Sequence, residues 1–185
     1  MSYIRTRNKG DRMNKESINN DYTFEKLHLF NTEDWKAIPE CGGIYKVYKP
    51  DGFEMKFRVD SDAPDTDRYK RYDVGELEEK WKRIENCKDK YEEGLLYVGK
   101  AKNLRRRIGQ YVRTGYGVDA RHSGGRSIFQ LENNKQLMIK ISKCDNFDEC
   151  ESEELDNYKI HRDDMLPFAN RILGKKKVGR GKNEC

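Results

Sequence analysis

The sequence predicts an α+β domain in which helices pack on a small antiparallel sheet. Residues 42–49, "GGIYKVYK", alternate along the chain and are rich in β-branched and aromatic side chains, which is typical of a strand. Residues 95–99, "LLYVG", form the short apolar run of a buried strand. The apolar residues of segment 101–112 then recur at helical spacing. This mixture of strands and helices, without an internal repeat, favours the α+β class.

The first quarter of the chain is predicted to contain an arm, a helix and two strands. Residues 1–25 are polar and aperiodic, and we expect a disordered arm there. "NTEDWKAI" predicts a short helix before Pro39, with Asn31 or Thr32 as its N-cap. "PDG" then predicts a turn, and the alternating "FEMKFRV" that follows predicts a strand paired with residues 42–49.

The rest of the chain alternates between helices, loops and one more strand. Helical spacing of Leu77, Trp81 and Ile84 predicts a helix that ends at Gly94. A glycine-rich loop follows residue 112, and "LMIKI" predicts a strand with alternate residues on one face. "NFDECESEELDNYKIH" predicts a helix, and residues 173–185 read as a basic flexible tail. We therefore expect one folded domain over residues 26–172.

Composition restricts the class of protein. Of the 185 residues, 38% are charged and 35% hydrophobic, which predicts one compact core under an ionic surface. No apolar run is long enough for a membrane span and no signal-peptide pattern is present, so we expect a cytoplasmic protein without a membrane partner. The five cysteines include no C-x-x-C pair, which favours unpaired thiols over a zinc site or disulfides.

Charge is divided unevenly along the chain. Residues 100–126 hold eight basic side chains and one acid, whereas residues 145–156 hold seven acids and no base. Segregated positive charge favours a polyanionic partner such as a nucleic acid, although charge runs are also common on solvated faces. Charge alone leaves both interpretations open.

Two charged residues lie at the edge or in the middle of apolar helical stripes. Arg107 borders the stripe of helix 101–112, whereas Arg106 points away from it, so Arg107 either reaches into a cleft or snorkels to solvent. Glu151 shares a stripe with Phe147 and Leu155. Because a carboxylate there is costly unless it is paired or binds a cation, Glu151 is either a metal ligand or the salt-bridge partner of an arginine across the core.

Five elements of the chain, in order, resemble the GIY-YIG endonucleases. They are "GIY" at 43–45, "YVG" at 97–99, an arginine at Arg107, a glutamate at Glu151 and "PFAN" ending at Asn170. This family includes the nuclease domain of the bacterial excision-repair incision enzyme, homing endonucleases and some restriction enzymes. The resemblance covers residues 41–172 and implies a small three-stranded antiparallel sheet flanked by helices, with metal-dependent hydrolysis of DNA phosphodiester bonds.

The chain departs from the family pattern in two places. Tyr45 and Tyr97 are 52 positions apart, whereas a short hairpin joins the two motifs in most members, so residues 51–93 are predicted to be an insertion. The segment from the glutamate to Asn170 is also long, which leaves Glu154 as a second choice for the metal ligand. "HSGGRSIFQL" (122–131) resembles bacterial members with long insertions, and His122 and Arg126 are expected near the cleft.

The resemblance implies a role for each matched residue. Glu151 would hold Mg²⁺ or Mn²⁺, and Arg107 would clamp the scissile phosphate. Tyr45 would orient or deprotonate the attacking water, and Lys100 would supply the charge that lowers its pKa. Further expectations are a place at the reaction for Tyr97 and His122, DNA contacts from Lys102, Arg105, Arg113 and Arg126, and structural roles for Gly43, Gly99 and Asn170.

The predicted function is thus a DNA endonuclease that depends on a divalent metal. The competing prediction is a nucleic-acid-binding module that keeps the fold without cleavage. These residues leave restriction-type cleavage and repair incision equally open. Sequence specificity would have to come from the insertion 51–93, the loop 114–126, the tails or a homodimer.

Overall fold

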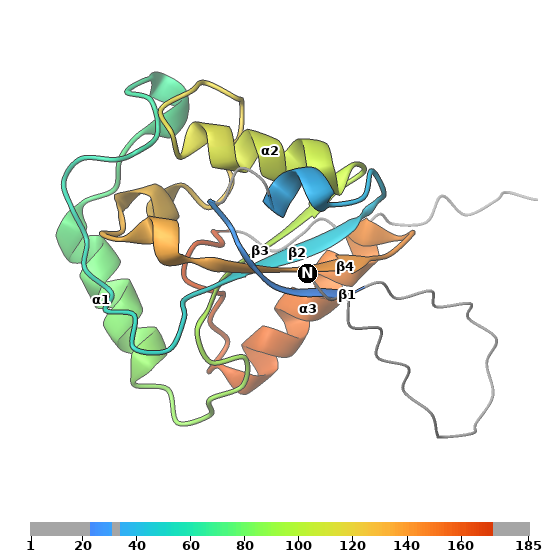
Figure 1. The fold of residues 1–185 in the computed structure, drawn as a ribbon. Coiled ribbons are helices and arrows are strands. Elements are labelled where there is room, and N and C mark those ends of the chain that lie inside the picture. The colour runs from blue at the N-terminus through green and yellow to red at the C-terminus, as the bar shows by residue number, and fades with distance from the viewer. Residues whose placement is uncertain (1–22, 31–33, 172–185) are drawn as a thin grey trace, which may run out of the picture.

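The computed structural model describes residues 23–30 and 34–171, and these form an α+β fold. Figure 1 shows one sheet with helices packed against it. The strands are β1 (Thr23–His28), β2 (Gly43–Tyr48), β3 (Leu95–Ala101) and β4 (Met138–Lys143). The α-helices are α1 (Val74–Glu85), α2 (Leu104–Thr114) and α3 (Phe147–His161), and the short 3-10 helices are η1 (Asp34–Ala37), η2 (Asp67–Tyr69), η3 (Arg126–Gln130) and η4 (Asn134–Gln136). None of the described helices has the length and apolar character needed to cross a membrane.

The sheet is antiparallel, with strand order β1-β4-β2-β3. Its inner strand β2 pairs Tyr45 with Gly99 on β3 and with Ile141 on β4. The prediction of three strands is wrong by one, because β1 pairs with β4 and begins at Thr23, inside the stretch assigned to the polar arm. The two signature strands are adjacent despite the 52 positions between their tyrosines.

Helices cover the two faces of this sheet. In Figure 1, α2 lies above the sheet together with η1, and α3 lies below it. The main core lies on the α2 side and includes Leu104, Ile108 and Tyr111. A smaller cluster joins β3 to α3 through Val98, Leu155 and Tyr158. These positions are those that the helical spacing of the sequence places on buried stripes.

The insertion folds as loops, the short helix η2 and the α-helix α1, without the predicted second strand. Residues 53–59 form only an isolated bridge between Phe57 and Leu131. Their alternation instead reflects one-sided burial, since Phe53 is buried and Met55 and Phe57 pack against the core. Helix α1 does form, and its N-cap Asp73 accepts a hydrogen bond from the backbone N–H of Glu76.

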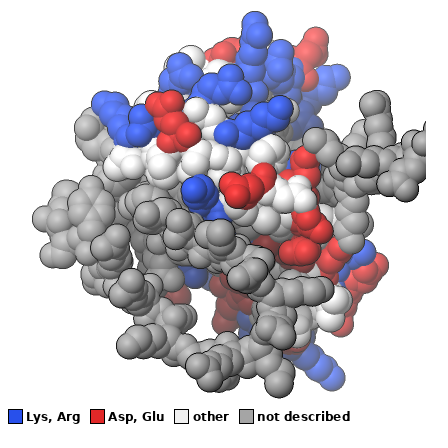
Figure 2. Space-filling view, turned by 90° about the vertical axis from the view of Figure 1, so that its right-hand side faces the viewer, with Lys and Arg blue, Asp and Glu red and all other residues white. Residues whose placement is uncertain are grey.

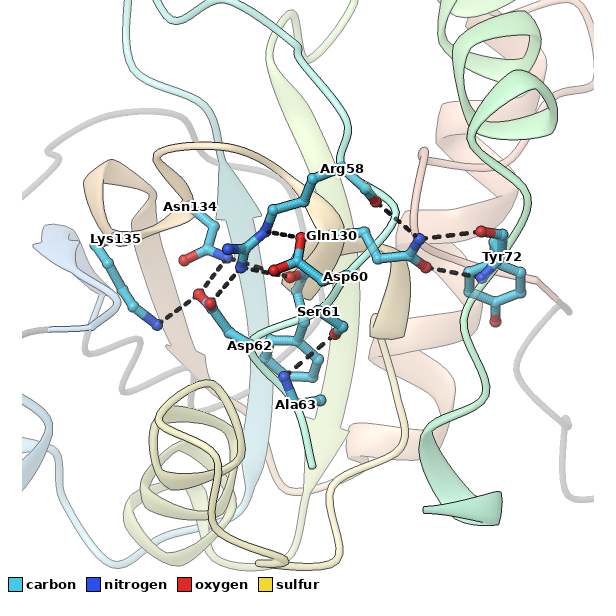
Figure 3. A network of polar contacts seen from close by, with 10 residues as sticks. Arg58, Asp60, Ser61, Asp62, Ala63, Tyr72, Gln130, Asn134 and Lys135 are labelled. Carbon is cyan, nitrogen blue, oxygen red and sulfur yellow. Dashed lines mark hydrogen bonds and ion pairs between the residues drawn. The ribbon is translucent and has the colours of Figure 1, made fainter. Parts of the chain in front are cut away.

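Polar side chains, of which Gln130 is fully buried, tie the insertion to the chain before β4 (Figure 3). The Gln130 side chain accepts from the backbone N–H of Tyr72 at 2.8 Å and donates to its carbonyl at 3.0 Å. Arg58 forms an ion pair with Asp62, which also pairs with Lys135 at 3.0 Å. Buried polar groups that are satisfied in this way fix one packing arrangement. The insertion is therefore an integral part of the domain.

The closing segment covers the free edge of β3. Asn170 accepts from the backbone N–H of Val98 and donates to its carbonyl, both at 2.9 Å, so its amide pairs with the strand as a neighbouring strand would. Lys80 of α1 donates to the carbonyls of Phe168 and Asn170, at 2.6 Å and 3.1 Å. The insertion helix thus holds the segment that fixes β3 beside Tyr97 and Gly99.

Candidate active site

Three tyrosines and one histidine from four parts of the chain meet on the α2 side of the sheet. Tyr45, Tyr111 and His122 are fully buried, and Tyr97 is 8% exposed. The rings of Tyr45 and Tyr97 are 5.9 Å apart, and those of Tyr111 and His122 stack at 4.2 Å with an interplanar angle of 6°. The structure therefore brings Tyr45, Tyr97 and His122 together, as predicted, and adds Tyr111.

Glycines make room for this tyrosine–histidine cluster. A Cβ on Gly99 would lie 2.5 Å from the Tyr45 hydroxyl oxygen, so only glycine lets the ring lie across β3. In the loop that carries His122, a Cβ on Gly125 would lie 2.7 Å from the Tyr111 hydroxyl. Gly43 is required for a different reason, because its Cβ would meet the backbone of β4 at Ser142. The loop around residues 122–125 thus closes directly over the aromatic hydroxyls.

The hydroxyl of Tyr45 is bonded to His122. Its oxygen lies 3.0 Å from Nε2 of His122, and both groups are buried. Burial and the nearby Arg107 guanidinium hold the pKa of His122 well below its ordinary value. The imidazole is therefore neutral at physiological pH, and in its tautomer protonated at Nδ1 the Nε2 atom accepts a hydrogen bond from the Tyr45 hydroxyl. His122 Nδ1 is buried without a hydrogen-bond partner among the described residues.

The cation beside Tyr45 is Arg107 and not Lys100. Burial raises the pKa of Tyr45, while the adjacent Arg107 and the Tyr97 hydroxyl act to lower it. Arg107 is partly exposed, and no carboxylate of the described residues forms an ion pair with it. An unpaired guanidinium at the entrance to a buried cluster is available to an anion such as phosphate.

Lys100 instead bridges two carboxylates of α3. Its ammonium lies 2.5 Å from Glu151 and 3.2 Å from Asp148. Burial opposes the charge on Lys100, but the hydrogen bonds that its ammonium donates to Glu151 and Asp148 raise its pKa overall. The buried Glu151 is thus paired with a cation, and that cation is a lysine of β3 and not the arginine considered from the sequence.

The donor set at Lys100 fits a hard divalent cation. Asp148 and Glu151 are one helical turn apart and converge on a single positive charge, so the ammonium of Lys100 stands where a metal ion would be attracted. Mg²⁺ is commonly held by one or two carboxylates, with water and substrate phosphates completing its shell. No three His, Cys, Asp or Glu side chains of the described ranges gather into a larger cluster.

Glu154, the second choice for the metal, lies elsewhere. Its carboxylate pairs with Lys46 at 2.6 Å, and Lys46 also pairs with Glu92 at 2.9 Å. Lys46 and Tyr45 are successive residues of β2 and point to opposite faces of the sheet. Lys100, the partner of Glu151, also points away from Tyr45, but Glu151 is near enough to act on the pKa of Tyr45, and this electrostatic contact favours Glu151.

The basic residues of α2 differ in their availability. Figure 2 shows lysine and arginine side chains gathered above a region rich in acids. Lys102 and Arg106 are exposed, whereas Arg105 donates to the Ile38 carbonyl at 2.6 Å and pairs with Glu40 at 2.8 Å. Arg105 thus anchors the segment before β2, which weakens its expected role in binding DNA.

The other two predicted DNA contacts lie away from the start of α2. Arg113 is exposed and donates to the Gly109 carbonyl at 3.3 Å. Arg126 donates to the Arg68 carbonyl at 3.0 Å and lies over the ring of Tyr72. Arg126 therefore faces the insertion.

Sequence reasoning missed Tyr111 and Asp148 as members of the site. Tyr111 looked like one more apolar residue on the stripe of α2, and its position against His122 depends on a loop that the pattern does not place. Asp148 precedes Glu151 by three positions, a spacing that puts two carboxylates on one helix face. This spacing could have indicated from the sequence that Asp148 lies beside Glu151.

Comparison of the chain with protein-family models, with curated proteins and with solved structures finds no match in any of the three.

Proposed function

We propose that this protein is a metal-dependent endonuclease that hydrolyses phosphodiester bonds in DNA, with the chemistry of the GIY-YIG enzymes that its motifs resemble. One observation carries the proposal. The Arg107 guanidinium, which forms no ion pair with a carboxylate of the described residues, lies beside the buried Tyr45 hydroxyl, and Glu151, which holds the Lys100 ammonium together with Asp148, also acts on the pKa of Tyr45. Phosphoryl transfer needs hydrogen-bond donors for the phosphate oxygens and, close to them, a metal-binding site.

In the proposed reaction, Arg107 and Tyr45 would have different roles. Arg107 binds the non-bridging oxygens of the scissile phosphate and neutralises charge as it develops. If the Tyr45 hydroxyl donates its hydrogen bond to His122, the lone pairs of its oxygen remain available as acceptors. These lone pairs would orient a donor such as a water molecule. The raised pKa of Tyr45 favours this orienting role over that of a base in the free protein.

Asp148 and Glu151 would hold Mg²⁺ or Mn²⁺, which when bound supplies Lewis-acid activation of the phosphate and of water. Lys100 would leave the carboxylates at that stage, since its ammonium occupies the same position. Its charge would then be free to meet the phosphate. Exposed Lys102 and Arg106 at the start of α2 would contact the flanking backbone.

The competing proposal is a module with this fold that binds nucleic acid without cutting it. Tyr45 and His122 are buried under the loop at residues 122–125, and this burial favours the binding module. The loop would have to move before a water molecule could reach the Tyr45 oxygen. The two proposals predict the same binding and differ only in the covalent step.

Incubation with supercoiled plasmid separates them. The endonuclease proposal predicts nicked or linear DNA with Mg²⁺ or Mn²⁺, none with EDTA, and recovery when excess metal is added back. A matched gel-shift experiment with the same plasmid measures binding. Retardation of the plasmid without strand breaks, for both metals and a range of duplex, single-stranded and branched substrates, would favour the binding module.

A further inference from the structure

A second group of cations lies on the insertion side of the domain, apart from Lys100 and α2. Lys80 and Arg83 of α1 and Arg171 after the closing segment line an open cavity of about 510 Å³. Arg126 of η3 lies close to this group, because its guanidinium and that of Arg171 both approach the ring of Tyr72, at 5.4 Å and 4.9 Å from its centroid. Three separate parts of the chain thus contribute positive charge here.

This charge is not engaged in direct ion pairs within the described ranges, although the carboxylates of Asp163 and Asp164 also line the cavity. None of the four cations forms an ion pair there, and the two carboxylates at the cavity are engaged by other groups. Asp164 pairs with Lys159 at 2.8 Å, and Asp163 accepts from Cys87 Sγ at 3.3 Å. Burial and repulsion from Arg171 and Arg83 lower the pKa of Lys80 to about 8. Uncompensated like charges are unfavourable, and a bound anion relieves them.

Two of these cations are held in place before any ligand arrives. Arg171 donates to the Tyr72 hydroxyl at 3.1 Å, and Arg126 donates to the Arg68 carbonyl at 3.0 Å. Tyr72 itself is fixed by the Gln130 side chain, as Figure 3 shows. Donors that are ordered in advance lose less conformational entropy on binding. The arrangement therefore has the properties of a prepared anion site.

We propose that Lys80, Arg83, Arg126 and Arg171 bind phosphate groups of the DNA backbone at a second contact, away from the phosphate held by Arg107. The identification of the anion as DNA rests on the proposed function. Cations contributed by α1, η3 and the closing segment suit a chain of phosphates better than one small ion. Arg126 directly follows Gly125 of the loop over the tyrosine–histidine cluster, so the second contact connects through η3 to the candidate active site.

Fluorescence anisotropy with a labelled DNA duplex, titrated from low to high salt, tests this second contact. The informative variants are Arg83→Ala and Arg171→Ala. The matched control is Lys82→Ala, because Lys82 is an exposed neighbour on α1 that does not line the cavity. Each informative variant is expected to weaken binding severalfold and to lower the slope of log K against log salt by about one, the value for one lost phosphate contact. Lys82→Ala should leave the slope unchanged.

Equal slopes for Arg83→Ala, Lys82→Ala and the unaltered protein would overturn the second contact. Plasmid cleavage by the same samples keeps the two proposals apart, since loss of the second contact leaves cleavage at saturating protein in place. If the unaltered protein never cleaves but the slopes still differ, the nuclease proposal fails and the second contact stands. A thermal shift with inorganic phosphate as large as that with duplex, and absent in Arg83→Ala, would mean a small-anion site and overturn the assignment to DNA.

Discussion

The hydroxyl oxygen of Tyr45 lies 3.0 Å from Nε2 of His122, a residue 77 positions away, and both side chains are fully buried. This contact joins the first signature strand to the glycine-rich loop. Arg107 and Tyr97 also lie close to the Tyr45 hydroxyl, since both act to lower its pKa. The account of the site depends on this arrangement.

Replacing Tyr45 by Phe should impair both stability and cleavage. The change leaves His122 Nε2 buried without a donor, in addition to the unpartnered Nδ1, so the free energy of unfolding should fall by about 1–3 kcal/mol. Cleavage should fall at least about 100-fold, the scale for a residue that handles the reacting proton or water. Denaturant unfolding and plasmid nicking measure the two effects.

Tyr48→Phe is the matched control for that change. Tyr48 is on the same strand, and its hydroxyl donates to Glu92 at 2.5 Å. This variant also loses a hydrogen bond, one that is partly buried, but should cleave at the normal rate. Equal losses of cleavage in the two variants would show that general destabilisation, and not the orientation at Tyr45, explains the effect.

Burial of His122 predicts a dependence of stability on pH between 7 and 5. The pKa of His122 in the folded protein lies well below its ordinary value of 6.5, so below pH 6.5 the unfolded chain binds a proton that the folded protein does not. Stability is therefore complete above pH 6.5 and falls as pH decreases toward the folded pKa, by about 1.4 kcal/mol per pH unit at most. The carboxyl groups with lowered pKa values start from 3.8 to 4.5 and add little in this window.

His122→Gln removes the titrating group and keeps an acceptor for Tyr45. The free energy of unfolding is measured for the unaltered protein and for this variant at several pH values. The difference between the two should change with pH as predicted for His122. Parallel curves for the two proteins from pH 7 to 5 would contradict a neutral, buried His122.

A methyl group on β3 should disturb the tyrosine–histidine cluster directly. In Gly99→Ala the new Cβ would lie 2.5 Å from the Tyr45 hydroxyl oxygen, so the ring must move away from His122. Overpacking of this kind costs about 1–3 kcal/mol and should abolish cleavage. Gly75→Ala, in the exposed first turn of α1, is the control and should be neutral or slightly stabilising. A fully active Gly99→Ala protein would remove the argument for close packing at this position.

Lys100 is expected to compete with a divalent ion for Asp148 and Glu151. Lys100→Met leaves the two carboxylates without their present partner, so Mn²⁺ should bind about fivefold more tightly, which corresponds to the ~1 kcal/mol of a partly exposed ion pair. Titration calorimetry or the paramagnetic resonance of free Mn²⁺ gives the affinity without reference to cleavage. Lys46→Met, which frees Glu154 and Glu92 instead, should leave this affinity unchanged. Weaker binding in Lys100→Met would contradict the competition.

The elements that the sequence predicted correctly are those with a strong period. Alternation placed β2 and β4, and helical spacing placed α2 and α3 within a few residues, whereas α1 ends at Glu85 and not at the predicted Gly94. β1 was missed because "TFEKLH" has a weak pattern beside a polar stretch. Residues 53–59 were wrongly assigned to a strand paired with residues 42–49, because alternation reports burial on one side and not pairing. Both edges of β2 are already occupied, by β3 and by β4.

For the candidate site, the order of the motifs predicted which residues come together but not which side chains they contact. The motif order selected Tyr45, Arg107 and Glu151, which the fold does bring into one region. The partner of Lys100 was misplaced, because the alternation of β3 sends residues 99 and 100 to opposite faces. Contacts such as Tyr45 with His122 depend on loop conformation, which no local pattern determines.

The central claim is that a metal held at Glu151 is required for cleavage, and one paired measurement tests it most directly. Initial rates of plasmid cleavage in Mg²⁺ are compared for Glu151→Gln and Glu154→Gln, two nearly isosteric changes on the same helix, of which only the first touches Lys100. The account predicts that the protein cleaves, that Glu151→Gln lowers the rate at least about 100-fold, and that Glu154→Gln stays within about twofold. Equal rates for the two variants, or a larger loss in Glu154→Gln, would contradict it.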